Sequence, residues 1–279
     1  MREIHVDTIS NSIEELFIEA NFNLPNDVLN AIDAAVSSEK SSAGKEVLQE
    51  LVTNAAIARR ERIPICQDTG LAVLFLEIGQ DVHISGGDLS SALSKGVRSA
   101  YEKGFLRKSC CDPFTRVNTG DNTPPIVHVK VVPGDSLKIT AMPKGGGSEN
   151  CGEVRMLTPA QGRDGVKAFV VEMVKRGGPN PCPPIIVGVG IGGNLETSAL
   201  LSKEALMIPL NQRNADPEIA LLEKELLEEI NDTGIGPQGY GGSVTALDVH
   251  VIKIPCHIAS LPVAVNIQCH AHRLRQTTL

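Results

Sequence analysis

Residues 64–78 read PICQDTGLAVLFLEI, and this stretch joins a polar loop to a run that is typical of a buried strand. The loop places a cysteine, an amide, a carboxylate and a hydroxyl side by side, with Pro64 before them and Gly70 after them. The preceding segment 42–62 has the apolar spacing of a helix, and proline is a residue that ends helices. The stretch therefore predicts a helix, a polar loop and a strand, in that order.

The pattern on either side of this stretch predicts an α+β fold. The N-terminal third is helical, and residues 88–106 form an amphipathic helix capped by Asp88. A mixed α/β region follows, in which residues 126–143 read as a hairpin around Pro133-Gly134-Asp135. No linker or repeat interrupts the chain, so we expect one compact domain over residues 1–279, with loops converging on a cluster site.

Composition excludes several classes of protein. The net charge is −7 and aromatic residues make up only 3%, which disfavours a nucleic-acid or an anionic-membrane partner. No apolar run reaches the length of a membrane span, and the N-terminus has no signal-peptide core. We therefore expect a cytoplasmic protein. In that compartment, seven scattered cysteines favour a metal site or catalysis over disulfides.

Three of the cysteines lie beside predicted strands. Cys66 and Cys182 each precede one, and Cys269 follows another. Prolines stiffen the first two loops, and a metal site needs stiff loops. The alternative for any single cysteine is a small buried apolar residue, and no CxxC pair is present.

Five motifs together carry a resemblance to a known family. They are CQDTG at 66–70, NTGDNTP at 118–124, KGGGSEN at 144–150, NPCPPIIVGVGIGG at 180–193 and QCHAHR at 268–273. From about residue 10 to its end, the chain resembles the class I fumarate hydratases and L-tartrate dehydratases, and in particular the alpha subunit of the two-subunit form. The resemblance implies a [4Fe-4S] cluster held by Cys66, Cys182 and Cys269. CHIASLP at 256–262 fixes the position of Cys269 in the pattern. Three thiolates leave one iron with an open position, which a hydro-lyase uses as a Lewis acid.

The resemblance also implies the other residues of the site. Asp68 and His257 are the catalytic candidates, and Gln67 is a candidate for binding a substrate carboxylate. Gly120, Lys95 and Lys144 complete the substrate-binding set. Lysine at 95 replaces an arginine of the single-chain relatives and lacks its bidentate fork, so Arg98, one turn on, is a possible stand-in. For each of these residues the alternative is an ordinary turn, loop or structural role.

The function implied is that of an alpha subunit of a [4Fe-4S]-dependent hydro-lyase. The first candidate reaction is the reversible hydration of fumarate to L-malate, with the hydroxyl on the open iron, and the alternative is dehydration of L-tartrate. No residue stands out as the base, which in the family belongs to a second domain, and we expect no counterpart of that domain in this chain. We therefore expect a separate beta subunit that completes the active site, in a heterotetramer.

Two other classes of function stay open. GVGIGG at 188–193 matches the dinucleotide-binding motif, which would suit an NAD-dependent oxidoreductase. The acidic residue expected about 20 positions later is missing, and we expect these glycines to allow close helix–strand packing instead. The remaining class is a non-catalytic iron–sulfur assembly protein.

Overall fold

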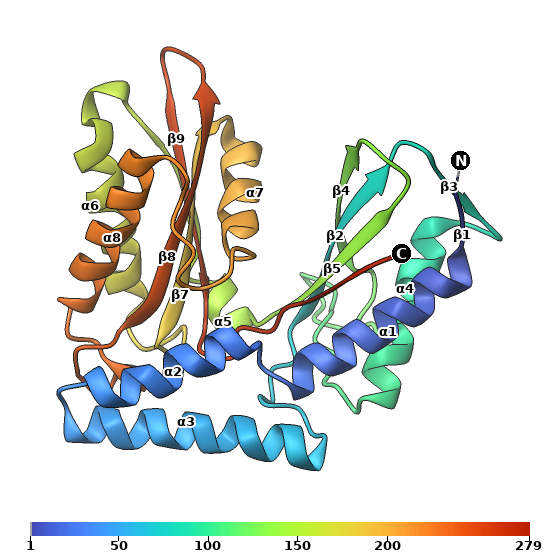
Figure 1. Ribbon diagram of the computed structural model, residues 1–279, viewed down its shortest axis with the longest axis horizontal. Helices are drawn as coiled ribbons and strands as arrows, with labels where there is room; N and C mark the ends of the chain where they lie inside the picture. The colour runs from blue at the N-terminus through green and yellow to red at the C-terminus, as the bar shows by residue number, and fades with distance from the viewer. Residues whose placement is uncertain (1) are drawn as a thin grey trace. The chain divides into compact units, whose positions relative to one another are not determined.

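The computed structural model describes residues 2–279 (Figure 1). Its helices and mixed sheets confirm the α+β fold class. Contacts divide the chain into two compact units that are interleaved in sequence. Unit 1 contains the residues up to Pro25, Asn54–Gly146 and Arg273–Leu279, and unit 2 contains Asn26–Thr53 and Gly147–His272. The expected single domain over 1–279 stays a prediction. The chain passes from unit 2 to unit 1 between Thr53 and Asn54, inside the helix Ser42–Glu61, which explains why the sequence shows no linker there.

Unit 1 contains a four-stranded sheet of order β10-β5-β2-β4 and a parallel pair, β1 and β3. The strands are β1 Arg2–His5, β2 Leu71–Gly79, β3 Val82–Ser85, β4 Ile126–Val132, β5 Leu137–Lys144 and β10 Arg275–Thr278. The predicted β4–β5 hairpin is wrong. β2 lies between the two strands, with Val73 opposite both Ile126 and Met142. The strand LAVLFLEI is buried along most of its length, so the main-chain N–H and C=O groups along both of its edges need hydrogen-bond partners from neighbouring strands.

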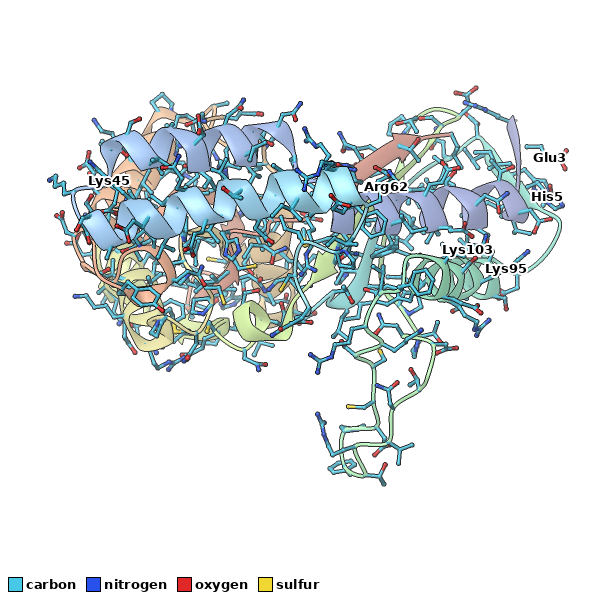
Figure 2. All side chains as sticks on the ribbon, turned by 90° about the horizontal axis from the view of Figure 1, so that it is seen from below. Glu3, His5, Lys45, Arg62, Lys95 and Lys103 are labelled. Atoms are coloured by element: carbon cyan, nitrogen blue, oxygen red, sulfur yellow. The ribbon has the colours of Figure 1, made fainter. Side chains whose placement is uncertain are left out.

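Helices α1 (Val6–Phe22) and α4 (Leu89–Lys103) cover one face of this sheet. They approach closely, because a Cβ on Gly96 would lie 2.6 Å from the carbonyl oxygen of Ser10. Asp88 caps α4 as predicted, accepting a hydrogen bond from the Ser91 N–H at 2.7 Å. Helix α3 (Ser42–Glu61) ends just before Arg62, whose guanidinium lies 5.4 Å from the centre of the Phe22 ring (Figure 2).

Unit 2 is built on a sheet of order β6-β9-β7-β8. Helices α6 and α8 cover one face and α7 covers the other (Figure 1). The strands are β6 Glu153–Leu157, β7 Ile185–Gly193, β8 Ala246–Cys256 and β9 Leu261–Gln268, and the helices are α2 Asn26–Ser38, α5 Gly146–Glu149, α6 Gly162–Gly177, α7 Leu195–Ala205 and α8 Pro217–Asn231. Two short 3-10 turns span Pro159–Gln161 and Pro237–Gly239.

The GVGIGG motif lies inside β7, and its glycines admit a neighbouring helix. A Cβ on Gly188 or Gly190 would lie 2.1 Å from a carbonyl oxygen of α7, that of Ser202 or Ser198 respectively. Helix–strand packing is therefore confirmed as the role of these two glycines. The motif does not form the strand-to-helix turn that holds a dinucleotide pyrophosphate.

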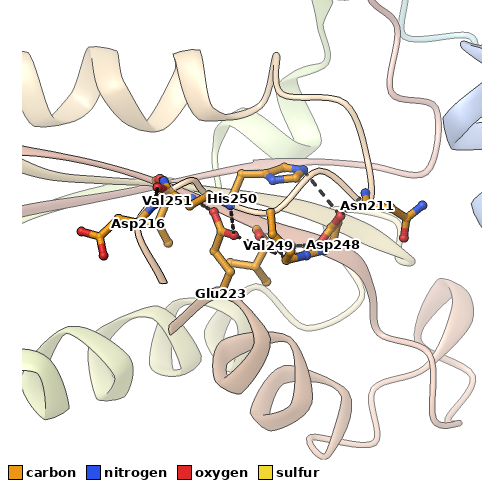
Figure 3. Close-up of polar contacts among 9 residues, drawn as sticks. Asn211, Asp216, Glu223, Asp248, Val249, His250 and Val251 are labelled. Atoms are coloured by element: carbon orange, nitrogen blue, oxygen red, sulfur yellow. Dashed lines mark hydrogen bonds and ion pairs between the residues drawn. The ribbon is translucent and has the colours of Figure 1, made fainter. Parts of the chain in front are cut away.

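Two buried polar clusters tie unit 2 together. The carboxylate of Glu39, 1% exposed, accepts main-chain N–H bonds from residues after α2 and from the segment before β8. The second cluster joins β8, α8 and the loop after α7 through Asp248, Glu223 and Asn211 (Figure 3). Burial raises the pKa of Glu223 and lowers the pKa of His250, so both groups tend toward their neutral forms.

Candidate functional site

The Cys66 loop of unit 1 runs from the end of α3 to the start of β2. Cys66 is half-buried, and Gln67 is exposed. Gly70 has a φ of +77°, and a Cβ there would lie 2.6 Å from the main-chain carbon of Lys144. Glycine is therefore required where this loop passes over the end of β5.

Side chains from separate segments hold the main chain of this loop. Its carbonyl oxygens accept hydrogen bonds on both sides of the Cys66-Gln67 pair: Ile65 O from Asn54 Nδ2 (2.9 Å), Asp68 O from Arg273 Nη1 (2.7 Å), Thr69 O from Tyr101 Oη (3.0 Å), and Gly70 O from Tyr101 Oη (2.8 Å) and Asn122 Nδ2 (3.3 Å). Irregular backbone needs such partners when it is buried, and here they come from side chains rather than from a sheet.

Asp68 connects the Cys66 loop to the glycine-rich segment after β5. Its Oδ1 accepts from Gly70 N at 3.0 Å and its Oδ2 accepts from Gly146 N at 2.8 Å. Lys144, only 1% exposed, ends β5 beside this contact. The structure thus brings three predicted residues, Cys66, Asp68 and Lys144, into one part of unit 1.

The 118–124 loop lies against the same region through Asn122. Gly120 is exposed, and its N–H already donates to Asn118 Oδ1 at 2.7 Å. Burial alone would raise the pKa of Asp121, but bonds from Thr123 and Arg98 outweigh it and hold the value at about 2. Asp121 is therefore an anion at neutral pH, paired with Arg98 at 2.9 Å.

Lys95 and Arg98, both on α4, contact different partners. Lys95 Nζ lies 2.9 Å from Asp7 Oδ1, at the start of α1 (Figure 2). Arg98 contacts the 118–124 loop instead. The structure therefore places the stand-in residue, and not Lys95, beside Gly120.

In unit 2, Cys182 and Cys269 lie at the same end of the sheet. β7 and β9 are antiparallel, so the start of one pairs with the end of the other, Ile186 opposite Gln268. The two cysteine loops touch, because the N–H of His270 donates to the carbonyl oxygen of Cys182 at 3.4 Å. Cys182 has a φ of +54° and stands between two prolines, so its loop conformation is narrowly defined.

His257 lies at the opposite end of that sheet, in the loop between β8 and β9. The eight residues of β9 separate it from Cys269, a length of about 26 Å at ~3.3 Å per residue. Its Nδ1 accepts from Ala259 N at 3.1 Å, so the neutral ring carries its proton on Nε2. It lines a mainly apolar cavity of about 450 Å³ with Val166 and Leu222. The structure does not bring His257 to Cys182 and Cys269.

Several residues that hold the loops have no counterpart among the predicted site residues. Tyr101, Asn122 and Arg273 are fully or almost fully buried and polar, and all three contact the Cys66 loop. Burial raises the pKa of Tyr101, so its hydroxyl stays protonated and remains a donor. The sequence offers a weak signal for two of them, because Asn122 and Arg273 belong to the quoted motifs. Tyr101 gives none.

Among residues 2–279, no three His, Cys, Asp or Glu side chains are grouped so as to hold a single metal ion. Cys66 belongs to unit 1, whereas Cys182 and Cys269 belong to unit 2. Over the same residues, no helix combines the length and apolar character needed to cross a bilayer.

Comparison with known proteins identifies the class. The model of the family described as "Fumarate hydratase (Fumerase)" matches residues 10–278, so the chain belongs to this family. It is a hydro-lyase of the class I fumarate hydratase and tartrate dehydratase alpha type. The resemblance inferred from the motifs is thereby confirmed.

Individual relatives match over nearly their whole lengths. The "Putative L(+)-tartrate dehydratase subunit alpha" of Methanocaldococcus jannaschii is 43% identical over 271 residues, 95% of each chain. The L(+)-tartrate dehydratase subunit alpha of Escherichia coli strain UTI89 is 37% identical over 266 residues, 92% of this chain and 88% of its own. That of Shigella sonnei is 36% identical with the same coverage. All three names describe an alpha subunit.

Proposed function

We propose that this chain is the alpha subunit of a [4Fe-4S]-dependent hydro-lyase that acts on a four-carbon dicarboxylate. The observation that carries the proposal is the contact between the loops of Cys182 and Cys269, in a chain that matches the family from residue 10 to 278. Cys66, on its braced loop in unit 1, is proposed as the third ligand. A set of three thiolates suits a cluster that keeps one iron free for substrate.

Different residues of this chain are proposed to bind the substrate and to orient the site around the cluster. When bound, the cluster supplies a Lewis-acidic iron with one position not taken by a thiolate. The exposed amide of Gln67 is proposed to donate to a substrate carboxylate. Arg98, beside the 118–124 loop, is proposed as a cation in place of Lys95. Asp68 keeps both oxygens on main-chain N–H groups, which suits a carboxylate that orients the site.

The partner and the substrate follow from the names of the relatives. Since these are named alpha subunits, we propose a separate beta subunit that completes the site, supplies the base and forms a heterotetramer with this chain. The same names favour L(+)-tartrate over the fumarate expected first from the motifs, while the family description favours fumarate. His257 is left out of the proposed site, because it lies at the far end of the sheet that carries Cys182 and Cys269.

The test is anaerobic reconstitution of the full chain with iron and sulfide, followed by addition of the partner subunit. The Cys182→Ser variant should lose most of its bound iron, and its activity toward tartrate and fumarate should fall by more than about tenfold. Cys256→Ser is the matched control, because Cys256 is also exposed but lies at the other end of the unit 2 sheet. Equal iron content in the two variants would reject the ligand assignment. A cluster without activity on either acid would instead favour an assembly protein.

A further inference from the structure

The hydroxyl of Tyr101 is held inside unit 1 with its direction fixed. The residue is 0% exposed and lies on α4, where its ring centre is 6.2 Å from that of Phe17. The surrounding cluster is apolar, and the hydroxyl is the one polar atom of the side chain. Because α4 packs along α1, the position of this oxygen is set by rigid elements rather than by a loop.

This one hydroxyl serves two consecutive carbonyl groups of the Cys66 loop. It donates to Gly70 O at 2.8 Å and to Thr69 O at 3.0 Å, so a single hydrogen is shared between them. Thr69, 1% exposed, is fixed a second time through its own hydroxyl, which donates to Arg107 O at 2.9 Å. A phenylalanine at 101 would keep the packing and leave Thr69 O without a donor.

The residues that carry the chemistry are the ones that this bracing leaves out. Within residues 2–279, neither Cys66 nor Gln67 makes a hydrogen bond, whereas Ile65 and Asp68–Gly70 on either side of them are held. The side chains of Cys66 and Gln67 thus project from a loop whose main chain is fixed on both sides of them. A metal ligand and a substrate-binding residue both require such a fixed main chain, because small displacements weaken metal and substrate binding.

We propose that Tyr101 is a positioning residue: its hydroxyl fixes the main chain of Thr69 and Gly70 and so sets how Cys66 and Gln67 are presented. The effect of Tyr101 on cluster and substrate binding rests on the proposed function, whereas its effect on the conformation of the Cys66 loop does not. Tyr101 acts through the loop, because both hydrogen bonds of its hydroxyl go to main-chain oxygens, those of Thr69 and Gly70, rather than to Cys66 or Gln67.

The test measures each thiol separately in the apo form of the full chain. Tyr101→Phe is compared with Tyr240→Phe, which alters the second of the two tyrosines, 71% exposed. Alkylation by iodoacetamide, followed by mass spectrometry, gives a rate for each of the seven cysteines. Loss of the shared hydrogen bond should raise the Cys66 rate about three- to tenfold. The rates at Cys182 and Cys256, exposed in the structure, should not change.

Two outcomes would overturn the proposal: an unchanged rate at Cys66, or a rise at all seven thiols together, which would make Tyr101 a core residue only. If Tyr101→Phe does not fold, Asn122→Asp tests the same brace. In its ionised form the aspartate has no donor for Gly70 O and keeps the acceptor for Ser109 N, so at a pH where it is ionised a selective rise at Cys66 is again expected.

A second readout uses the reconstituted protein. Tyr101→Phe should release iron to a chelator faster than Tyr240→Phe by a similar factor, and kcat with the partner subunit should fall more than KM rises. Equal rates of iron release would contradict the proposal. If the wild-type chain takes up no iron, the proposed function fails, but the alkylation result still decides whether Tyr101 braces the loop.

Discussion

Glu39 shows how a single buried carboxylate can hold distant segments together. It accepts from the N–H groups of Lys40 and Ser41, and from those of Ser243 and Val244 more than 200 positions later, at distances of 2.7 to 3.0 Å. Burial alone would raise the pKa of Glu39, but these main-chain donors together lower it below its ordinary value of 4.5. The charged form is therefore the one that stabilises the fold.

Glu39→Gln should lower the free energy of unfolding by about 1–3 kcal/mol at neutral pH, because a charged acceptor is lost. A group with a lowered pKa contributes stability that is present above 4.5 and is lost as the pH falls through the folded-state value. The gap between wild type and variant should therefore begin to close below about pH 4.5 and close further as the pH falls, as measured by urea unfolding from pH 7 to about pH 2.5. Glu50→Gln, on the exposed face of α3, is the control. A gap that stays constant with pH would contradict this assignment.

At the level of elements, apolar periodicity predicted most helices and strands but not how the strands pair. The Asp88-capped helix and the buried strand 71–78 were read directly from local pattern. The hairpin was wrong because strand order depends on β2, which is distant in sequence and lies between β4 and β5. Local spacing contains no information on such long-range pairing.

Gly190→Ala should destabilise the protein by about 1–3 kcal/mol through overpacking. The added Cβ would lie 2.1 Å from the carbonyl oxygen of Ser198, and neither β7 nor α7 can shift without moving the core of unit 2. Gly177→Ala is the control, because its nearest neighbour would be Cys151 Sγ at an ordinary 3.4 Å. Thermal unfolding of both variants checks this, and equal melting temperatures would show that β7 has room to move.

At the level of the whole molecule, the sequence predicted the family and the α+β class but not the interleaving of the two units. Motifs identify loops, and the resemblance to the family implies which of these loops carry chemistry. Motifs do not show which buried side chains hold those loops, as Tyr101 and Arg273 do. The position of His257 depends on the direction of β9, which its local sequence does not contain.

Removal of Arg273–Leu279 should loosen unit 1 selectively. The segment supplies β10, which pairs with β5 from Thr278 opposite Lys138 to Arg275 opposite Ala141, and Arg273 bonds to Asp68 O. Hydrogen exchange of the β5 amides should accelerate by more than about tenfold. The amides of β7, in unit 2, provide the internal reference. Unchanged protection of β5 would show that β10 is dispensable.

The order in which a ribosome makes this chain gives the late position of β10 a biosynthetic consequence. The edge of β5 that pairs with β10 has no partner until residues 273–279 have been synthesised, and the carbonyl group of Asp68 lacks its bond from Arg273 until the same point. Domains generally fold as units during translation, but unit 1 reaches its final form only after the segment Gly147–His272 of unit 2 and then residues 273–279 have been synthesised. The loop of Cys66 therefore acquires its bond from Arg273 only after the residues of unit 2 have been made.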